Sequence, residues 1–206
     1  MSDSITKTMY QLKVKFVTPV LGSQPGAKTP ASDYVRDKVK EARPDLNLED
    51  EVGTVPEELE KGTTLFQRGE NGKPMFLNYQ IKGMIKEAGS VMNGLNGVAN
   101  LKSKLDNLLF VYPRRIPVAT DKEITILERP LRGQTQQGPR TTLARSEMIA
   151  EGATFECELE VLESPKAKIN EELLRALLDY STRKGMGQWR NSGSYGQIEY
   201  QLTKKE

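Results

Sequence analysis

The sequence predicts an α+β protein with a ferredoxin-like (RRM-like, split βαβ) antiparallel sheet and a long insertion after the first strand. Three observations support this. Residues 9–18 and 154–162 both alternate apolar and polar side chains as half-buried strands do, and an amphipathic helix follows the second segment. The expected elements run strand, helix, strands, helix, strand. A length of 206 residues favours one domain over two, so we expect a single domain over residues 1–206.

The first strand is expected over Met9–Thr18, because apolar and lysine side chains alternate there with a period of two. The apolar members are Leu12, Val14 and Phe16, with Lys13 and Lys15 between them. Pro19 and Gly22 end this pattern. From about residue 23 to residue 73 the sequence is rich in glycine, proline and charge. We therefore expect a flexible, acidic insertion there, with one short helix around Asp33–Ala42.

The insertion holds an uneven share of the charge. Residues 41–60 contain eight acids and one base, a net of −7, so with a total of +2 the rest of the chain carries +9. A modestly basic body with an acidic appendage is typical of nucleic-acid binders and of many other proteins. The charge pattern alone therefore leaves the partner open.

Two helices, or one helix broken near Gly94 and Gly97, are expected after the insertion. Apolar residues recur there at helical spacing. The first set is Ile81, Met84, Ile85 and Ala88, and the second is Val98, Leu101, Leu105, Leu108 and Leu109. Short strands are expected next, around Asn107–Tyr112 and Glu123–Glu128.

The clearest strand lies over Thr154–Leu162, where apolar residues alternate strictly with glutamates. Asn170 then predicts the N-cap of a helix, and Gly185 follows its last turn. The apolar stripe of this helix is Ile169, Leu173, Leu174, Leu177 and Leu178. A last strand is predicted by the alternation of Ile198, Tyr200 and Leu202.

Composition excludes several kinds of chemistry. The chain has no histidine, which rules out a His general base, a Ser-His triad and His-ligated zinc. Its one cysteine, Cys157, cannot form an internal disulfide, and its place on the apolar face of a strand predicts a core thiol rather than a nucleophile. No apolar run reaches the roughly 20 residues of a membrane span, and residues 1–16 lack the apolar core of a signal peptide. We therefore expect a cytoplasmic protein without membrane contact.

The segment Lys184–Gln197 joins the last helix to the last strand and combines glycine, basic and aromatic residues, with no acid among them. Glycines allow the backbone to approach another chain closely, and Trp189 and Tyr195 offer flat faces on which a base could stack. The expected RNA-binding residues here are Lys184, Gly187, Gln188, Trp189, Arg190, Gly193 and Tyr195. The alternative is a helix C-cap that runs into a tight turn.

A second candidate is Lys82, which with Gly83 falls in the expected first turn of a helix over residues 78–88. Free backbone N–H groups at that position attract phosphate, and the lysine would add a charge-assisted contact. The alternative is a solvated lysine beside a glycine that allows close packing.

The third candidate segment, Arg129–Gly152, is rich in arginine and glutamine and has no core pattern. We therefore expect a flexible, polar segment that could follow a phosphate backbone. Its candidate RNA-binding residues are Arg132, Gln134, Gln137, Arg140 and Arg145. The alternative is a long disordered hairpin loop kept soluble by its charge.

Taken together, these segments resemble the RAMP superfamily of CRISPR systems, in an order that extends over residues 10–203. The shared features are Thr18-Pro19 with Gly22, Ile81-Lys82-Gly83, Pro139-Arg140 with Ser146-Glu147 and Gly152-Ala153-Thr154-Phe155, and Gly185-Met186-Gly187 with Arg190, Gly193 and Gly196. The likeness is greatest to the backbone subunits that line guide RNA. Family members often have small hydroxyl residues before the Lys-Gly pair, where this chain has Asn78, Tyr79 and Gln80.

The resemblance implies a ferredoxin-like, RNA-binding protein of antiviral defence that holds guide-type or other single-stranded RNA along a basic groove. It would act as a subunit of a CRISPR-type ribonucleoprotein complex. Its expected partners are RNA and either other subunits or copies of itself, and no resident cofactor is expected. We also expect Lys82, Arg140 and Arg190 to meet on one basic surface.

Two alternatives stay open. One is a stand-alone phage or mobile-element protein that binds a host immune component or a small nucleotide. The other is a metal-dependent RNA endonuclease. Asp33 and Asp37 are four residues apart, so on a helix their carboxylates could share one face and a Mg²⁺ ion. A solvated surface helix explains the same pair, because acids and bases interleave around it.

Overall fold

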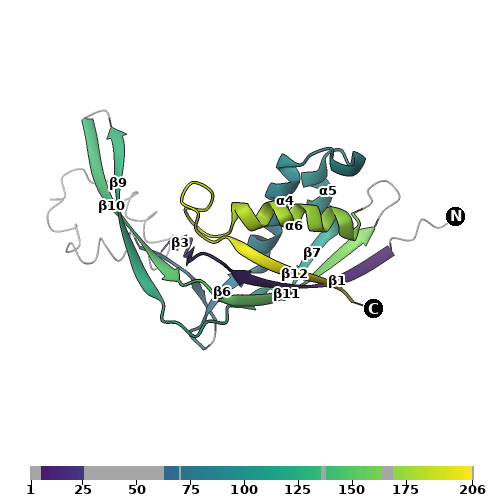
Figure 1. Ribbon diagram of the computed structural model, residues 1–206, viewed down its shortest axis with the longest axis horizontal. Helices are drawn as coiled ribbons and strands as arrows, with labels where there is room; N and C mark the ends of the chain where they lie inside the picture. Colours follow the sequence, from purple (N-terminus) through teal and green to yellow (C-terminus); the bar gives the residue numbers. More distant parts are fainter. Residues whose placement is uncertain (1–5, 26–62, 70, 136–137, 164–168, 206) are drawn as a thin grey trace, which may run out of the picture.

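The computed structural model describes residues 6–25, 63–69, 71–135, 138–163 and 169–205. These residues form a mixed α+β protein whose strands pair mostly antiparallel. The described part contains three α-helices, which lie together on one side of the sheet that contains β1, β11 and β12 (Figure 1). The expected α+β class is therefore confirmed. The helix expected around Asp33–Ala42 and the acidic residues 41–60 lie outside the described residues.

Four strands form the central sheet, in the order β12-β1-β11-β7, with every neighbouring pair antiparallel. Their bounds are β1 Thr6–Phe16, β7 Leu109–Tyr112, β11 Thr154–Glu163 and β12 Ile198–Lys204. Helices α4, Asn78–Val91, and α5, Leu101–Leu108, come between the first and second of these strands in the chain. Helix α6, Glu171–Lys184, comes between the third and fourth. The break expected near Gly94 and Gly97 is present as a 3₁₀ turn over Leu95–Gly97.

The helices cover one face of this sheet and bury the apolar side chains that alternate along its strands. On β1, Leu12 and Phe16 are fully buried, and Leu12 lies opposite Leu202 on one side and Cys157 on the other. Helix α6 buries its predicted leucine stripe completely. Its N-cap is also confirmed, because Asn170 Oδ1 accepts a hydrogen bond of 3.0 Å from the Leu173 amide.

The opposite face of β1, β11 and β12 carries ion pairs between lysines and glutamates of neighbouring strands. Lys7 Nζ lies 2.7 Å from Glu160 Oε2, and Lys13 Nζ lies 3.1 Å from Glu156 Oε1. In the described parts of these three strands, every aromatic side chain belongs to the alternating set that faces the helices. RRM proteins bind RNA by stacking bases on aromatic side chains of the open sheet face. On β1, β11 and β12 this face therefore lacks the groups for that mode of binding, whereas the edge strand β7 has the exposed Tyr112.

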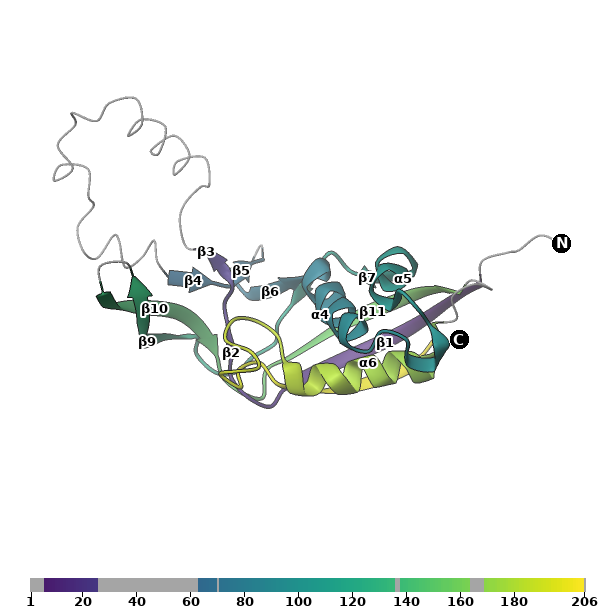
Figure 2. The same ribbon diagram turned by 90° about the horizontal axis from the view of Figure 1, so that it is seen from above.

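A long two-stranded ribbon extends away from the helices (Figures 1 and 2), formed by β9, Thr125–Thr135, and β10, Gly138–Ile149. The expectation of a flexible segment here was wrong. The two strands pair in register from Thr125 opposite Met148 to Thr135 opposite Gly138, and Arg145 Nε lies 2.8 Å from Glu128 Oε1 on the facing residue. The base of β10 also pairs with β2, Val20–Leu21, and in parallel with β4, Thr63–Leu65.

The insertion is shorter than expected, because residues 63–69 belong to the folded body. Strand β4 pairs with β3, Gln24–Pro25. A small sheet follows, made of β5, Gln67–Arg68, β6, Pro74–Leu77, and β8, Arg115–Pro117. Phe76 of β6 anchors it to the main sheet, with its ring 5.8 Å from that of Phe16 and 5.6 Å from that of Phe155. Strand β6 leads directly into α4, which fixes the start of that helix.

Candidate functional site

The glycine-rich loop, residues 185–197, is held tightly against residues 17–21, the segment from the end of β1 to β2 (Figure 2, beside β2). The Gly196 amide donates to Pro19 O at 2.7 Å, and the Met186 amide donates to Gly196 O at 2.9 Å. Gly187 has φ of +79°, and a Cβ there would lie 2.5 Å from Leu21 O. These glycines are therefore required by the fold, and the expected tight turn after the helix is present.

The two aromatic residues of the loop, Trp189 and Tyr195, both make cation–π contacts with Arg129. The guanidinium carbon of Arg129, at the base of β9, lies 4.9 Å from the Trp189 ring centroid and 5.5 Å from that of Tyr195. Contacts of this kind contribute about 0.5–2 kcal/mol each, depending on desolvation. Arg129 Nη1 is buried and has no hydrogen-bond partner among the described residues. The loop is thus attached to the ribbon, and a base that stacked on Trp189 would compete with Arg129.

A polar cluster makes a second connection between the loop and the ribbon. Gln188 Oε1 accepts hydrogen bonds from Thr64 Oγ1 at 3.0 Å and from Ser146 Oγ at 3.1 Å. The neighbouring Glu147 is buried, accepts from the Phe66 amide at 2.7 Å and pairs with Arg68. The Ser146-Glu147 pair of the sequence resemblance therefore joins residues 63–69 to β10.

A hollow of about 400 Å³ lies between the loop, α4 and the segment before β3. Its floor is apolar and buried, formed by Phe76, Met84 and Met186. Its rim is polar and aromatic, formed by Gln24, Tyr79, Gln80 and Arg190. Tyr79 is 55% exposed, and its hydroxyl oxygen accepts a hydrogen bond of 3.3 Å from Gln24 Nε2. This combination of an apolar floor and a few oriented polar groups is typical of ligand sites.

Two clusters of cations lie along α4, and each shares one carboxylate. The first reaches the hollow through Arg190, whereas no residue of the second lines it. Glu87 of α4 lies 2.8 Å from Arg190 Nη2 and 3.3 Å from Lys184 Nζ. The loop itself has no acid, as expected, but α4 supplies one. Asp106 of α5 lies 2.8 Å from Lys86 Nζ and 3.6 Å from Lys82 Nζ.

The two lysines beside Asp106 also lower the pKa of its carboxyl group. The hydrogen bond from Lys86 and the charges of both lysines hold the pKa of this carboxyl below its ordinary value. Because each carboxylate serves two cations, each cluster keeps a net charge of +1.

Lys82 is not in the first turn of its helix, because α4 begins four residues earlier at Asn78. The first amides have protein partners: the Asn78 amide donates to Arg114 O at 3.0 Å, and the Leu77 amide donates to Gln80 Oε1 at 2.8 Å. Lys82 Nζ instead lies 5.2 Å from the Phe110 ring centroid, above a smaller hollow of about 130 Å³ that Tyr79 also lines. Its neighbour Gly83 lines the larger hollow.

The remaining predicted residues are placed only in part. The backbones of Arg132, Gln134 and Arg140 lie on the ribbon, beyond Arg145 toward its tip. Their side chains, together with Gln137 and the pair Asp33 and Asp37, lie outside what the structure describes. The convergence of Arg140 with Lys82 and Arg190 and the Mg²⁺-dependent alternative therefore stay predictions. In the described residues no group of three His, Cys, Asp or Glu side chains could hold a metal ion.

The sequence did not single out three side chains that shape this region: Gln24, Tyr79 and Glu87. Arg129 was expected only as part of a basic segment that could follow RNA, not as a partner of Trp189. A signal for two of them exists, since Tyr79, Gly83 and Glu87 are spaced four residues apart and so share one helix face. No such signal exists for Gln24 or Arg129, because their neighbours in space are far away in the sequence.

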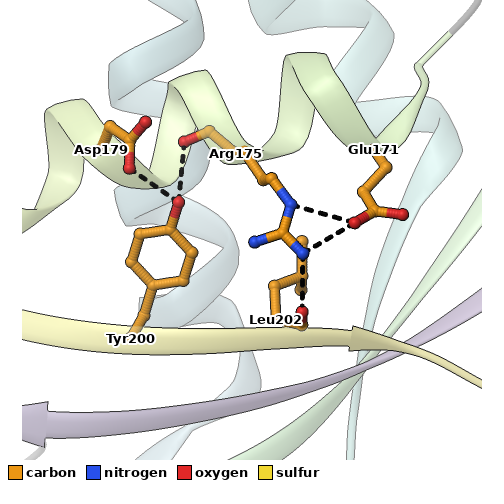
Figure 3. Close-up of polar contacts among 5 residues, drawn as sticks. All are labelled: Glu171, Arg175, Asp179, Tyr200 and Leu202. Carbon is orange, nitrogen blue, oxygen red and sulfur yellow. Dashed lines mark hydrogen bonds and ion pairs between the residues drawn. The ribbon is translucent and has the colours of Figure 1, made fainter.

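The far end of α6 is held to the edge strand by a separate polar network (Figure 3). Tyr200 donates to Asp179 Oδ1 at 2.7 Å, and Arg175 Nη2 donates both to Glu171 Oε1 at 2.7 Å and to Leu202 O at 2.8 Å. Burial and the bond to Asp179 raise the pKa of Tyr200 to about 12. This network stabilises β12 and does not reach the hollow.

Cys157 is buried as expected, and burial raises the pKa of its thiol to about 12. A thiol with so high a pKa carries almost no thiolate at neutral pH, so Cys157 is a core residue. Among the described residues, no helix has the length and apolar character needed to cross a membrane.

Comparison with known proteins gives a structural likeness and no sequence match. No family model and no curated protein matches the chain. Among solved structures, the chain is similar to a chain of Type III-B Cmr-beta bound to cognate target RNA, with 12% sequence identity and a TM-score of 0.48. The similarity covers 97% of this chain and 61% of that chain, so this protein spans less than two thirds of its structural neighbour.

Proposed function

We propose that this chain binds single-stranded RNA at the hollow between α4 and the glycine-rich loop, as a ferredoxin-like subunit of a CRISPR-type ribonucleoprotein complex. The strand order β12-β1-β11-β7 is antiparallel throughout, and helices follow β1 and β11, the strands of this sheet that come first and third in the chain. This arrangement supports the split βαβ assignment. The ordered set of motifs from residue 10 to residue 203 supports the relationship to CRISPR backbone subunits.

One observation carries the proposal: the hollow combines an apolar floor and an aromatic rim with Arg190, whose cluster keeps an excess positive charge. Unpaired RNA presents flat apolar bases beside a chain of phosphates, so its binding sites combine stacking surfaces with cations. Tyr79 and Arg190 supply one of each at the rim. On the open face of β1, β11 and β12, Lys7 and Lys13 are instead paired with glutamates.

The proposal is tested by fluorescence anisotropy with a labelled single-stranded RNA of about 30 nucleotides, titrated at several salt concentrations. If three or four phosphates are neutralised, the slope of log K against log salt should be about −2 to −3 for a single strand. The variant pair Tyr79→Ala and Arg190→Ala should weaken binding, whereas Lys13→Ala on the open sheet face is the matched control and should not. Equal losses in all three variants, or no binding at low salt, would contradict the proposal.

A further inference from the structure

We propose that the hollow accepts one unpaired nucleobase, and that Gly83 is a glycine because any side chain there would occupy the space of that base. This inference rests on the proposed RNA binding and adds what part of the RNA the site recognises. Gly83 itself has no role in the packing of the fold.

Gly83 lies inside α4, where glycine is a poorer helix former than alanine. Two ordinary reasons for such a glycine are absent. Its φ lies outside the left-handed region, and a Cβ built on it would meet no described atom within 4 Å. Gly89, two turns later in the same helix, is different, because a Cβ there would lie 2.4 Å from Leu105 Cδ1 of α5. Close packing of the helices therefore explains Gly89 and does not explain Gly83.

The space in front of Gly83 is the hollow itself. Tyr79 lies one turn before Gly83 on the same face of α4, and Glu87, which holds Arg190, lies one turn after it. The glycine thus leaves a notch in the helix surface between an exposed aromatic ring and a paired arginine.

The chemistry of the hollow fits a base better than a phosphate. A phosphate placed on Phe76, Met84 and Met186 would lose its hydration without compensation. A base has apolar faces that suit this floor and the Tyr79 ring, and a polar edge that needs hydrogen-bond partners.

The side-chain amides of Gln80 and Gln24, at the rim, are held by hydrogen bonds in positions where they could bond to the polar edge of a base. Gln80 Oε1 accepts from the Leu77 amide at 2.8 Å, and its amide nitrogen donates to Ser23 Oγ at 3.4 Å, which leaves the second amide hydrogen for a base. Gln24 Nε2 donates to the Tyr79 hydroxyl, which leaves Gln24 Oε1 without a donor among the described residues. The volume of about 400 Å³ lies near the lower end of the roughly 300–1,000 Å³ found for small-ligand pockets, which suits one nucleoside rather than several.

The test compares Gly83→Ala and Gly83→Leu in the full chain, with Ser90→Ala as the matched control. Ser90 is an exposed residue of α4 outside the hollow. Melting temperature is measured on each sample, together with affinity for a single-stranded RNA that carries 2-aminopurine, whose fluorescence reports the environment of the base. Gly83→Ala should melt at or above the wild-type temperature but bind RNA about tenfold more weakly, the loss expected for one stacked base. Gly83→Leu should abolish the 2-aminopurine response, and Ser90→Ala should bind as wild type does.

Each other outcome is decisive. A wild-type chain that binds no RNA contradicts the proposed function itself. A wild-type chain that binds RNA, with both Gly83 variants folded and binding equally well, contradicts only the base site. A clear fall in melting temperature for Gly83→Ala would show that the glycine serves the fold, and would also overturn the inference.

Discussion

The contact of Arg129 with Trp189 and Tyr195 predicts that one arginine of the ribbon fixes the conformation of the glycine-rich loop. The guanidinium lies within 5.5 Å of both ring centroids, and one of its nitrogens is buried. Two such contacts, partly offset by the unpaired nitrogen, should stabilise the fold by about 1–2 kcal/mol in total. Replacing Arg129 with leucine should lower the free energy of unfolding by that amount.

The assay is favourable because Trp189 is the sole tryptophan of the chain, so its fluorescence reports on the loop alone. In Arg129→Leu, the Trp189 emission should shift and acrylamide quenching should increase, while urea unfolding gives the change in stability. Arg145→Leu is the matched control, because Arg145 lies on the same ribbon but pairs with Glu128. It should change stability by no more than about 1 kcal/mol and leave the emission unchanged. Unchanged emission and unchanged stability in Arg129→Leu would refute the reasoning.

Three further predictions concern the body of the fold. Gly89→Ala should destabilise the protein by about 1–3 kcal/mol in urea unfolding, because the new methyl group would overlap Leu105; a neutral result would show that α4 and α5 can separate freely. Tyr200→Phe should cost about 0.5–1.5 kcal/mol through the lost bond to Asp179. The pKa of Tyr200 is raised to about 12 in the folded protein, so the contribution of this group is complete below pH 10 and is lost as the pH rises from 10 to 12; Tyr200→Phe should flatten that part of the stability curve. Cys157 should react with a thiol reagent only after unfolding, and rapid reaction of the native protein would contradict its burial.

The sequence predicted the elements that have one buried face and one exposed face. Burial on one side imposes a period of two on β1 and β11 and a helical period on α6, so these patterns are visible in the sequence. Of the ribbon of β9 and β10, only the start of β9 was predicted, within Glu123–Glu128, because the rest extends away from the core. Leu143, for example, is 46% exposed, and such a strand shows no apolar alternation.

The candidate site was predicted only in part, for a related reason. Trp189 and Arg190 stood out because they lie in a short segment with unusual composition. Their partners could not be predicted, because Arg129 and Glu87 reach them only through tertiary structure. The same holds for Lys82, whose place in the helix depends on where β6 ends rather than on its own neighbours in the sequence.

The most direct test of the central claim is to map where RNA contacts the native protein. Single-stranded RNA substituted with 4-thiouridine is photocrosslinked to the wild-type chain, and the modified residues are identified by mass spectrometry. The account predicts cross-links at Tyr79 and within the glycine-rich loop, around the hollow that they share with Arg190. Cross-links confined to the open face of β1, β11 and β12, with none at α4 or the loop, would contradict it.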